Sequence, residues 1–255
     1  MTALTASLRK TIASLDSVSK RREYGLFKAE GLKCVTDTSR GFAISELFVS
    51  GKWREDNPGV LENATVISAR DIERMSSMST PPGVIGVFRI PVFESLGPEN
   101  LKGRLTLALD SIRDPGNLGT IIRVADWMGV SDIVCSADTV DCFSPKVVQA
   151  TMGSLSRVKC HYLDLRELLA ASPVKVFGTF LNGENIYRSQ LESNGVIVIG
   201  NESHGISPEI ESVISRRLTI PTFPEGADAA ESLNAAVATS IVLSEFRSRQ
   251  WQKKN

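Results

Sequence analysis

Leu107-Ala-Leu-Asp-Ser-Ile-Arg-Asp-Pro-Gly-Asn-Leu-Gly-Thr-Ile-Ile-Arg-Val-Ala-Asp-Trp-Met-Gly129 carries the strongest structural signal in the chain. The apolar run 105–109 predicts a buried strand, and Asp114-Pro-Gly116 lies in the polar turn that follows it. A helix is expected from about Asn117, a candidate cap, because apolar residues then recur at helical spacing: Leu118, Ile121, Ile122 and Ala125. A strand, a polar turn and a capped helix, in this order, form the place where α/β sheets bind ligands.

Arg123 occupies the edge of this apolar helix face. A guanidinium keeps its charge and needs hydrogen-bond acceptors, so Arg123 is expected to point into a polar site or to pair with a carboxylate. The segment alone is equally compatible with an ordinary strand–helix unit that carries a solvated arginine.

Two later segments repeat the pattern. Gly195-Val-Ile-Val-Ile-Gly200 predicts a second buried strand that ends in a glycine turn, and Ser207-Pro208 is placed to start a helix. Arg217-Leu-Thr-Ile220 predicts a third strand, followed by a loop and, after Ser232-Leu-Asn234, by an Ala-rich helix. Strands that alternate with helices from Leu105 onward predict a parallel sheet with helices on both faces.

A dinucleotide-binding fold is the simplest interpretation of such a pattern. However, no Gly-x-Gly-x-x-Gly follows the first strand, and the turn after it is too polar and too poor in glycine to hold a pyrophosphate. A nucleotide-dependent dehydrogenase is therefore disfavoured.

Three blocks resemble, in order and spacing, the motifs of a known family. They are Asp114-Pro-Gly-Asn-Leu-Gly-x-x-x-Arg123-x-Ala125, Gly200-Asn-Glu-x-x-Gly205, and Ile220-Pro221 followed by Ser232-Leu-Asn234 and a small-residue helix. On these motifs the chain is similar to the SpoU-like (TrmH-like) RNA 2′-O-ribose methyltransferases of the SPOUT class. The resemblance covers about residues 105 to 246 and is specific to the family, not to one member.

The resemblance implies an α/β fold in two domains. A C-terminal SPOUT domain, residues 104–255, would hold a parallel sheet and a deep trefoil knot, in which the segment 232–234 threads a loop after Gly200. Residues 1–92 would form a small α/β domain that binds RNA, and residues 93–103, punctuated by proline and glycine, would form a linker.

Periodicity adds detail at both ends of the chain. A helix is expected within residues 1–18, and strands are expected over 44–49, 64–67 and 84–88. The C-terminal helix, about residues 229–253, helps to form a homodimer in the family. Its apolar spacing would look the same if it only covered the core.

S-adenosylmethionine is the cofactor that the resemblance implies, and a ribose 2′-hydroxyl of ribosomal or transfer RNA is the implied acceptor. Methyl transfer from a sulfonium is a displacement at carbon and needs no metal. Arg123 occupies the position of the arginine with which the family activates this hydroxyl. Because arginine is almost always protonated, we favour electrostatic stabilisation of the developing alkoxide over a role as general base.

Further site residues follow from the same motifs. Asn117, Glu202, Ser232 and Asn234 are the remaining candidate catalytic residues, and the two asparagine amides supply both donors and acceptors. Asn117 and Ser232 are also placed to cap helices, a role that is compatible with function. The family builds its cofactor site mostly from backbone at turns that end strands, and the matching positions here are Thr179, Phe180, Leu181, Gly200, Asn201, Ile220 and Leu233. Glycine at position 200 has a physical reason, because the absence of a side chain allows the cofactor to approach the backbone closely. A simple turn at the end of the strand would also favour glycine.

The overall charge does not indicate a nucleic-acid partner, because the formal net charge is zero. Lys20-Arg21-Arg22 is a basic cluster that could bind RNA phosphates. A solvated helix face explains three basic residues equally well.

Cysteine usage and targeting signals favour a soluble cytoplasmic protein. The four cysteines show no C-x-x-C spacing and are typical of small buried hydrophobes in a reducing compartment: Cys34, Cys135, Cys142 and Cys160. Two histidines offer little for a zinc site, so no metal is expected. Neither a signal peptide nor a membrane span is evident.

Two departures from the family pattern leave alternatives open. His204 stands where many relatives have glycine or an acidic residue, and the loop 222–231 differs in length or shape. The competing hypotheses are a catalytically inactive RNA-binding protein of the same architecture and a SPOUT enzyme that methylates a base. The presence of Arg123, Glu202, Ser232 and Asn234 favours an active enzyme, and the pairing of Asn117 with Arg123 favours ribose.

Overall fold

The computed structural model describes residues 4–224, 226–227 and 230–252, and the chain divides into two compact units. The first unit comprises the chain up to Val92 together with Asp141–Arg157. The second comprises the rest, so the predicted linker 93–103 and its short helix η1 (Pro98–Leu101) belong to the second unit.

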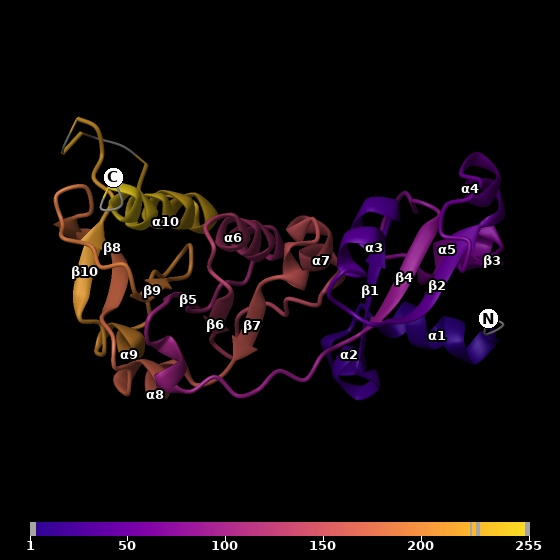
Figure 1. Cartoon of the computed structure of the whole chain (residues 1–255), viewed down its shortest axis with the longest axis horizontal. Coiled ribbons are helices and arrows are strands. Elements are labelled where there is room, and N and C mark those ends of the chain that lie inside the picture. The colour runs from indigo at the N-terminus through magenta and orange to yellow at the C-terminus, as the bar shows by residue number, and fades with distance from the viewer. Residues whose placement is uncertain (1–3, 225, 228–229, 253–255) are drawn as a thin grey trace. The chain divides into compact units, whose positions relative to one another are not determined.

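The first unit contains a four-stranded sheet in the order β1-β4-β2-β3 (Figure 1). β4 runs antiparallel to both β1 and β2, whereas β2 and β3 are parallel. Its elements are α1 (Ala6–Ser14), α2 (Val18–Tyr24), β1 (Leu26–Glu30), α3 (Leu32–Thr38), β2 (Ile44–Ser50), α4 (Gly51–Asp56), β3 (Thr65–Ile67), α5 (Ala69–Met75), β4 (Val84–Arg89), α7 (Pro145–Thr151) and η2 (Ser154–Ser156).

Long-range aromatic contacts hold the segment 141–157 in the first unit. The ring of Phe143 lies 4.9 Å from that of Phe27 on β1, and Phe27 stacks at 5.5 Å on Phe88 of β4. The Arg21 side chain also donates to the Asp141 carboxylate at 2.8 Å. The sequence placed this segment in the C-terminal domain, and the structure differs because its apolar face is buried against β1.

The second unit contains a six-stranded, fully parallel sheet in the order β10-β8-β9-β5-β6-β7. The predicted α/β class and parallel sheet are confirmed. Besides η1, its elements are β5 (Leu105–Leu109), α6 (Pro115–Trp127), β6 (Asp132–Cys135), β7 (Lys159–Tyr162), α8 (Leu165–Ala170), β8 (Val176–Asn185), β9 (Gly195–Ile199), α9 (Pro208–Glu211), β10 (Arg216–Thr219) and α10 (Ala235–Gln252).

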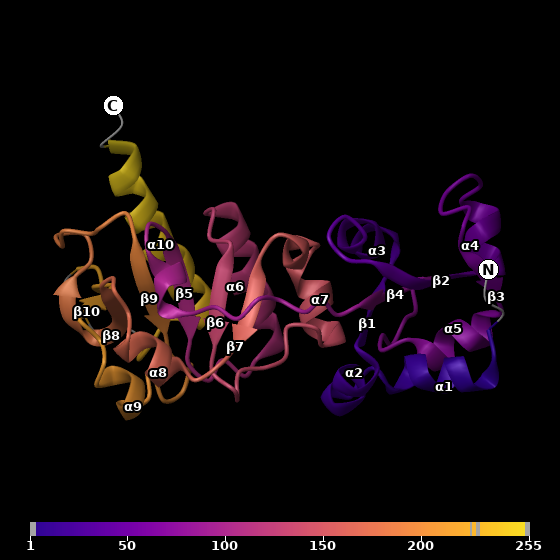
Figure 2. The same cartoon turned by 60° about the horizontal axis from the view of Figure 1, so that its bottom comes forward.

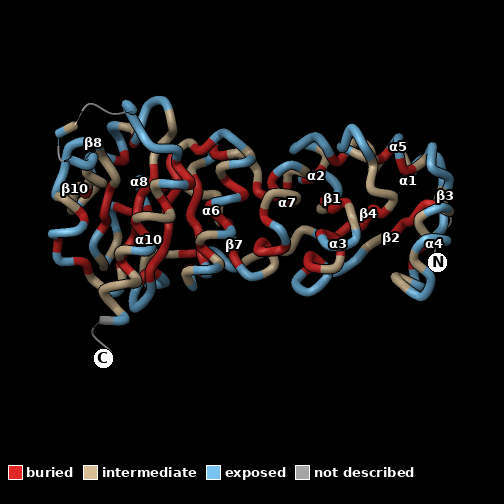
Figure 3. The backbone as a smooth tube through the Cα atoms, turned by 90° about the horizontal axis from the view of Figure 1, so that it is seen from above, coloured by how far each residue is buried: buried red, intermediate tan, exposed pale blue. Residues whose placement is uncertain are grey.

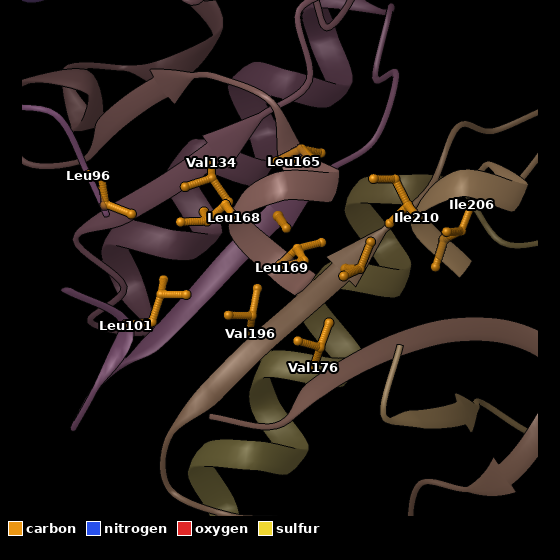
Figure 4. Packing of buried hydrophobic residues seen from close by; sticks show 12 residues of the cluster. Leu96, Leu101, Val134, Leu165, Leu168, Leu169, Val176, Val196, Ile206 and Ile210 are labelled. Atoms are coloured by element: carbon orange, nitrogen blue, oxygen red, sulfur yellow. The ribbon is translucent and has the colours of Figure 1, made fainter. Parts of the chain in front are cut away.

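Helices cover both faces of this sheet. Figures 1 and 2 show α6 and α10 side by side on one face, and α8 and α9 lie on the other. Figure 4 shows leucines of α8 and isoleucines at and before α9 packed against the strand valines Val134, Val176 and Val196. On the opposite face, Phe177 of β8 meets Phe246 of α10 with ring centroids 5.1 Å apart.

The central strands β5 and β9 are buried along their whole length. In Figure 3 the buried segments of the second unit run through its interior and the exposed segments lie outside them. A parallel sheet covered on both faces requires near-continuous apolar strands. The runs 105–109 and 195–199 meet this requirement, and both strands were predicted with these bounds.

The structure corrects three local predictions. Helix α6 begins at Pro115, because Asp114 caps it by accepting the Asn117 N–H at 2.8 Å; Asn117 is not the cap. Residues 179–181 lie inside β8 and not in a turn that ends it. Helix α10 begins at Ala235, not at about residue 229, because the Asn234 carbonyl oxygen Oδ1 accepts the Ala236 N–H at 2.9 Å. Residues 229 and 253 themselves lie outside the described residues.

No helix among the described residues is both long enough and apolar enough to cross a membrane.

Candidate active site

A cavity of about 770 Å³ opens in the second unit at the carboxyl ends of its strands. Five chain segments line it: the middle of β8, the end of β9 with the turn after it, the last residue of α9, the residue after β10, and the start of α10 with its approach. This is the edge where parallel α/β sheets bind ligands. The lining residues are Thr179, Phe180, Leu181, Asn182, Ile199, Gly200, Asn201, Glu202, Ser203, His204, Gly205, Ile206, Glu211, Ile220, Glu231, Ser232, Leu233, Ala235 and Ala238.

Gly200 is required by the turn after β9. The backbone groups of Asn201 and Gly205 exchange hydrogen bonds of 2.9 and 2.8 Å, which folds the turn back on itself. A Cβ atom at position 200 would lie 2.3 Å from Gly205 C and from Ile206 N. Any side chain there would therefore force the turn open, a stronger reason for glycine than close approach to a ligand.

Asn201 fastens this turn to the end of β5. Its side-chain amide donates to the Ser111 carbonyl oxygen at 2.8 Å, and its Oδ1 accepts the Ser203 N–H at 2.8 Å. Asn201 therefore acts as a structural link as well as a lining residue.

Asp110 is a buried carboxylate that the sequence did not single out. It directly follows β5, is 4% exposed, and accepts the Ser207 N–H at 2.7 Å through Oδ2. The sequence feature that could have identified Asp110 is a charged residue directly after an otherwise apolar strand. Asp110 holds the far side of the turn after β9, so we regard it as a positioning residue.

A chain of hydrogen bonds connects three predicted catalytic residues. The Asn234 amide donates to Asn117 Oδ1 at 2.8 Å, and the Asn117 amide donates to Glu202 Oε1 at 2.5 Å. These contacts join residues that are 117 and 85 positions apart in the chain. Because Asn117 is fixed from both sides, the Glu202 carboxylate is held at the cavity wall.

Ser232 and Arg123 are placed differently. Ser232 is exposed and lines the cavity. Arg123 is exposed on α6 and does not line the cavity, and its side chain makes no hydrogen bond or ion pair within the described part of the chain. It lies six residues beyond Asn117, about 9 Å further along the helix axis. The structure therefore brings Asn117, Glu202, Ser232 and Asn234 to one place and leaves Arg123 apart from them.

All seven residues that the family resemblance assigned to the cofactor line the cavity. The Thr179 hydroxyl donates to the Val198 carbonyl at 3.2 Å, and Thr219 Oγ1 donates to the Leu181 carbonyl at 3.1 Å. These bonds tie the middle of β8 to the strands on either side of it.

Arg217 supports the cavity wall formed by the middle of β8, and it was not identified from the sequence as a site residue. Its guanidinium lies 3.7 Å from the centre of the Phe180 ring, and its Nη2 donates to Asn182 Oδ1 at 2.7 Å. It also pairs with Glu211. Since all three partners line the cavity and Arg217 does not, Arg217 shapes the wall without facing the cavity.

His204 is an exposed residue of the turn after β9. Its backbone N–H donates to Asn201 Oδ1 at 3.2 Å, so the residue takes part in the local turn geometry, and it also lines the cavity.

The turn after β5 is anchored by an acidic side chain. Hydrogen bonds from the Ser111 and Ser136 hydroxyls lower the pKa of Asp138 to about 2. The Asp138 carboxylate thus holds the side chain of Ser111, a non-glycine residue whose φ of 60° lies in the left-handed region.

The three predicted RNA-binding residues lie in the first unit and differ in exposure. Arg21 is 2% exposed, and its guanidinium donates hydrogen bonds to the Asp141 carboxylate and to the Leu15 and Asp16 carbonyls. We therefore do not propose Arg21 as an RNA-binding residue. Lys20 pairs with Glu23, and Arg22 is exposed.

Residues 104–244 match the model of the SpoU rRNA Methylase family, and the chain belongs to this family. A Porphyromonas gingivalis structure assigned to the TrmH family of RNA methyltransferases is 35% identical, with a TM-score of 0.84 over 97% of this chain and 100% of that one. An AdoMet-bound rRNA methyltransferase from Sinorhizobium meliloti is 33% identical, with a TM-score of 0.80 over 98% of this chain and 97% of that one. The 23S rRNA (guanosine(2553)-2′-O)-methyltransferase of Bacillus subtilis is 29% identical over 91% of this chain and 93% of its own length. The predicted family resemblance is confirmed.

Proposed function

We propose that this protein transfers a methyl group from S-adenosylmethionine to a ribose 2′-hydroxyl of ribosomal or transfer RNA. The observation that carries the proposal is one cavity lined by all seven expected cofactor residues and bordered by the Asn234–Asn117–Glu202 hydrogen bonds. Family membership supports it, as do relatives that bind AdoMet or are named ribose 2′-O-methyltransferases.

The cavity suits this cofactor in size and chemistry. Its volume of about 770 Å³ lies in the range of small-molecule sites. Ile199, Ile220 and Leu233 offer apolar contacts to adenine, and Glu211 and Glu231 offer carboxylates to an amino group. When bound, S-adenosylmethionine supplies an electrophilic methyl group on a positively charged sulfur.

The protein residues have to orient the ribose and accommodate its proton. In the reaction the ribose oxygen bonds to the methyl carbon while the carbon–sulfur bond breaks, and the hydroxyl proton leaves to phosphate or water. We assign to Arg123 the stabilisation of the negative charge that develops on the oxygen. Glu202, held by Asn117, orients the RNA, because Arg123 makes no ion pair with it in this structure, and Ser232 contacts the substrate from the cavity rim.

A homodimer through the C-terminal domain belongs to the proposal. α6 and α10 pack together and expose several large apolar side chains, including Trp127 at 88% and Val237 at 48%. Large apolar side chains exposed to this extent favour a surface that a partner subunit covers.

Three broader features complete the proposal. We infer a deep trefoil knot in which residues 232–234 thread the loop after Gly200, consistent with the bond from Asn234 to Asn117. We also infer that the N-terminal α/β domain, residues 1–92, binds RNA and delivers the target ribose. We further infer a cytoplasmic, metal-independent enzyme, and the burial of all four cysteines is in keeping with a reducing compartment.

The test combines cofactor binding with methyl transfer. Calorimetry with S-adenosylmethionine should give saturable binding, and RNA incubated with the labelled cofactor should gain methyl groups that map to ribose 2′-oxygens. An absence of cofactor binding at millimolar ligand would favour an inactive RNA-binding protein. Methyl groups found on bases would favour a SPOUT base methyltransferase.

A further inference from the structure

A second cavity, of about 300 Å³, lies wholly within the first unit. We call it the β1–α7 cavity, after the elements on either side of it. Its lining residues are Lys28 and Glu30 of β1, Ser77 and Met78 after α5, and Pro145, Lys146, Gln149 and Ala150 of α7. None of these residues takes part in the candidate active site.

The floor of the β1–α7 cavity carries one positive and one negative charge. Lys28 and Glu30 are alternate residues of β1, so they share one face of the strand, and they are only 1% and 3% exposed. The Lys28 ammonium donates to the Met75 carbonyl at 2.5 Å and pairs with Asp16 at 2.9 Å.

Both floor groups keep unused hydrogen-bonding capacity. The Glu30 carboxylate accepts the Ser77 N–H at 2.7 Å and the Ser76 hydroxyl. An ammonium has three donors and a carboxylate about four acceptor positions. The floor can therefore offer a donor beside an acceptor.

This combination restricts the ligand class. Glu30 disfavours a free anion such as phosphate at the floor, and Lys28 disfavours a free cation. The walls are largely apolar, with contributions from Met78, Pro145 and Ala150. A neutral ligand with flat apolar faces and a mixed donor–acceptor edge fits, and a nucleobase has this chemistry.

The mouth of the cavity carries polar groups that are available to a ligand. Lys146 is exposed and Gln149 is half-buried, and the side chain of neither makes a hydrogen bond or ion pair with other described residues. A cation at the mouth suits the phosphate that adjoins a base held inside.

We propose that the β1–α7 cavity binds one unstacked nucleobase of the RNA substrate, with Lys146 on a neighbouring phosphate. This inference rests on the proposed function, because that function makes RNA the substrate. It gives the first unit a specific part in RNA recognition: a base is held there while the ribose is methylated at the second unit.

Cavity filling tests the proposal in the full chain. Fluorescence anisotropy with a labelled pool of random single-stranded RNA oligonucleotides should show that Ala150→Phe weakens binding about fivefold or more, as expected when one stacked base is displaced. Ala69→Phe, at an exposed alanine of α5 in the same unit, should bind like the parent. Parent affinity in a folded Ala150→Phe protein would overturn the proposal.

A second pair of variants serves if the large side chain prevents folding. Lys146→Ala should weaken RNA binding and flatten its salt dependence by about one phosphate contact, whereas the matched exposed-lysine variant Lys10→Ala should not. Equal behaviour of the two variants would contradict the proposed phosphate contact.

Crosslinking locates the base directly and separates this inference from the proposed function. RNA that contains 4-thiouridine should crosslink, on irradiation of the parent protein, to peptides containing Met78 or residues 145–150. Crosslinks confined to other peptides would reject the β1–α7 cavity even if the protein methylates RNA. Crosslinks at this cavity without any methyl transfer would leave the inference standing and refute the proposed function.

Discussion

Arg123 offers the sharpest test at the level of a single residue. Its side chain is exposed and bonded to nothing in the described chain, so its loss should not disturb the fold or the cofactor cavity. We expect Arg123→Ala to lower the methylation rate by about 100-fold or more, the usual effect of removing one group that stabilises transition-state charge. Calorimetry should give an unchanged Kd for S-adenosylmethionine.

The control for this variant is Arg166→Ala, at an exposed arginine of α8 on the opposite face of the sheet. It should retain parent methylation. Should Arg123→Ala methylate RNA at the parent rate, Arg123 has no part in the reaction.

Asn234 combines two roles that substitutions can separate. Its Oδ1 caps α10 and its Nδ2 donates to Asn117. Asn234→Ala should lose both contacts, lowering stability by about 1 kcal/mol and weakening cofactor binding and turnover. Asn234→Asp keeps the cap but has no donor for Asn117, so its Tm should match the parent while its turnover falls. Full turnover in the aspartate variant would remove Asn234 from the site.

Among the elements, β8 shows how a strand becomes a binding surface. Its pairing with β10 jumps from Gly178–Arg217 to Leu218–Glu184, so residues 179–183 bulge out of register. Four of the bulged residues line the cavity: Thr179, Phe180, Leu181 and Asn182. In a regular strand, successive side chains point to opposite faces of the sheet. A bulge changes these directions, so consecutive residues can contribute to one surface.

Arg217 should therefore control cofactor affinity through this bulge. Removing its contact with the Phe180 ring and its bond to Asn182 loosens the cavity wall, and a cation–π contact is worth about 0.5 to 2 kcal/mol. We expect Arg217→Ala to raise the Kd for S-adenosylmethionine by about 2- to 30-fold with little change in kcat. Arg216→Ala, at the neighbouring residue that pairs with Glu184, serves as the control and should leave the Kd unchanged. An unaltered Kd in Arg217→Ala would show that the bulge holds its shape alone.

Elements with a strong local signal could be predicted, and those set by distant contacts could not. The apolar runs of β5 and β9 determine their own burial, so their bounds were predicted from sequence. The bulge of β8 depends on register with β10, which no pattern within residues 176–185 encodes. Helix α6 begins earlier than predicted because Asp114 and Pro115 act as cap and first residue, a local signal that we assigned to the turn.

At the scale of the whole molecule, the site depends on segments far apart in the chain. The family motifs predicted residues that line the cavity. Composition and periodicity alone predicted only a parallel sheet with helices on both faces. Asp110 and Arg217 were missed because they act through partners that only the folded chain brings near. The grouping of residues 141–157 with the first unit likewise rests on long-range contacts of Phe143 and Asp141.

Asp132 links three segments of the second unit and makes stability depend on pH. It bonds to His161 of β7 at 3.0 Å, to the Ser131 hydroxyl at 2.7 Å, and to Arg104 before β5 at 3.0 Å. The hydrogen bond with His161 is the largest of the causes that lower the pKa of Asp132 from 3.8 to about 2. Since the folded carboxyl has the lower pKa, the unfolded chain takes up its proton first as the pH falls.

The stabilisation from Asp132 should therefore be complete above about pH 4 and disappear as the pH falls towards 2. A shift of this size corresponds to about 2 kcal/mol. Denaturant unfolding of the parent and of Asp132→Asn at several pH values measures it: the parent should be the more stable protein at pH 6, and the difference should shrink between pH 4 and pH 2. A difference that stays constant across this range would mean that packing at position 132, and not the charge of the carboxylate, supplies the stability.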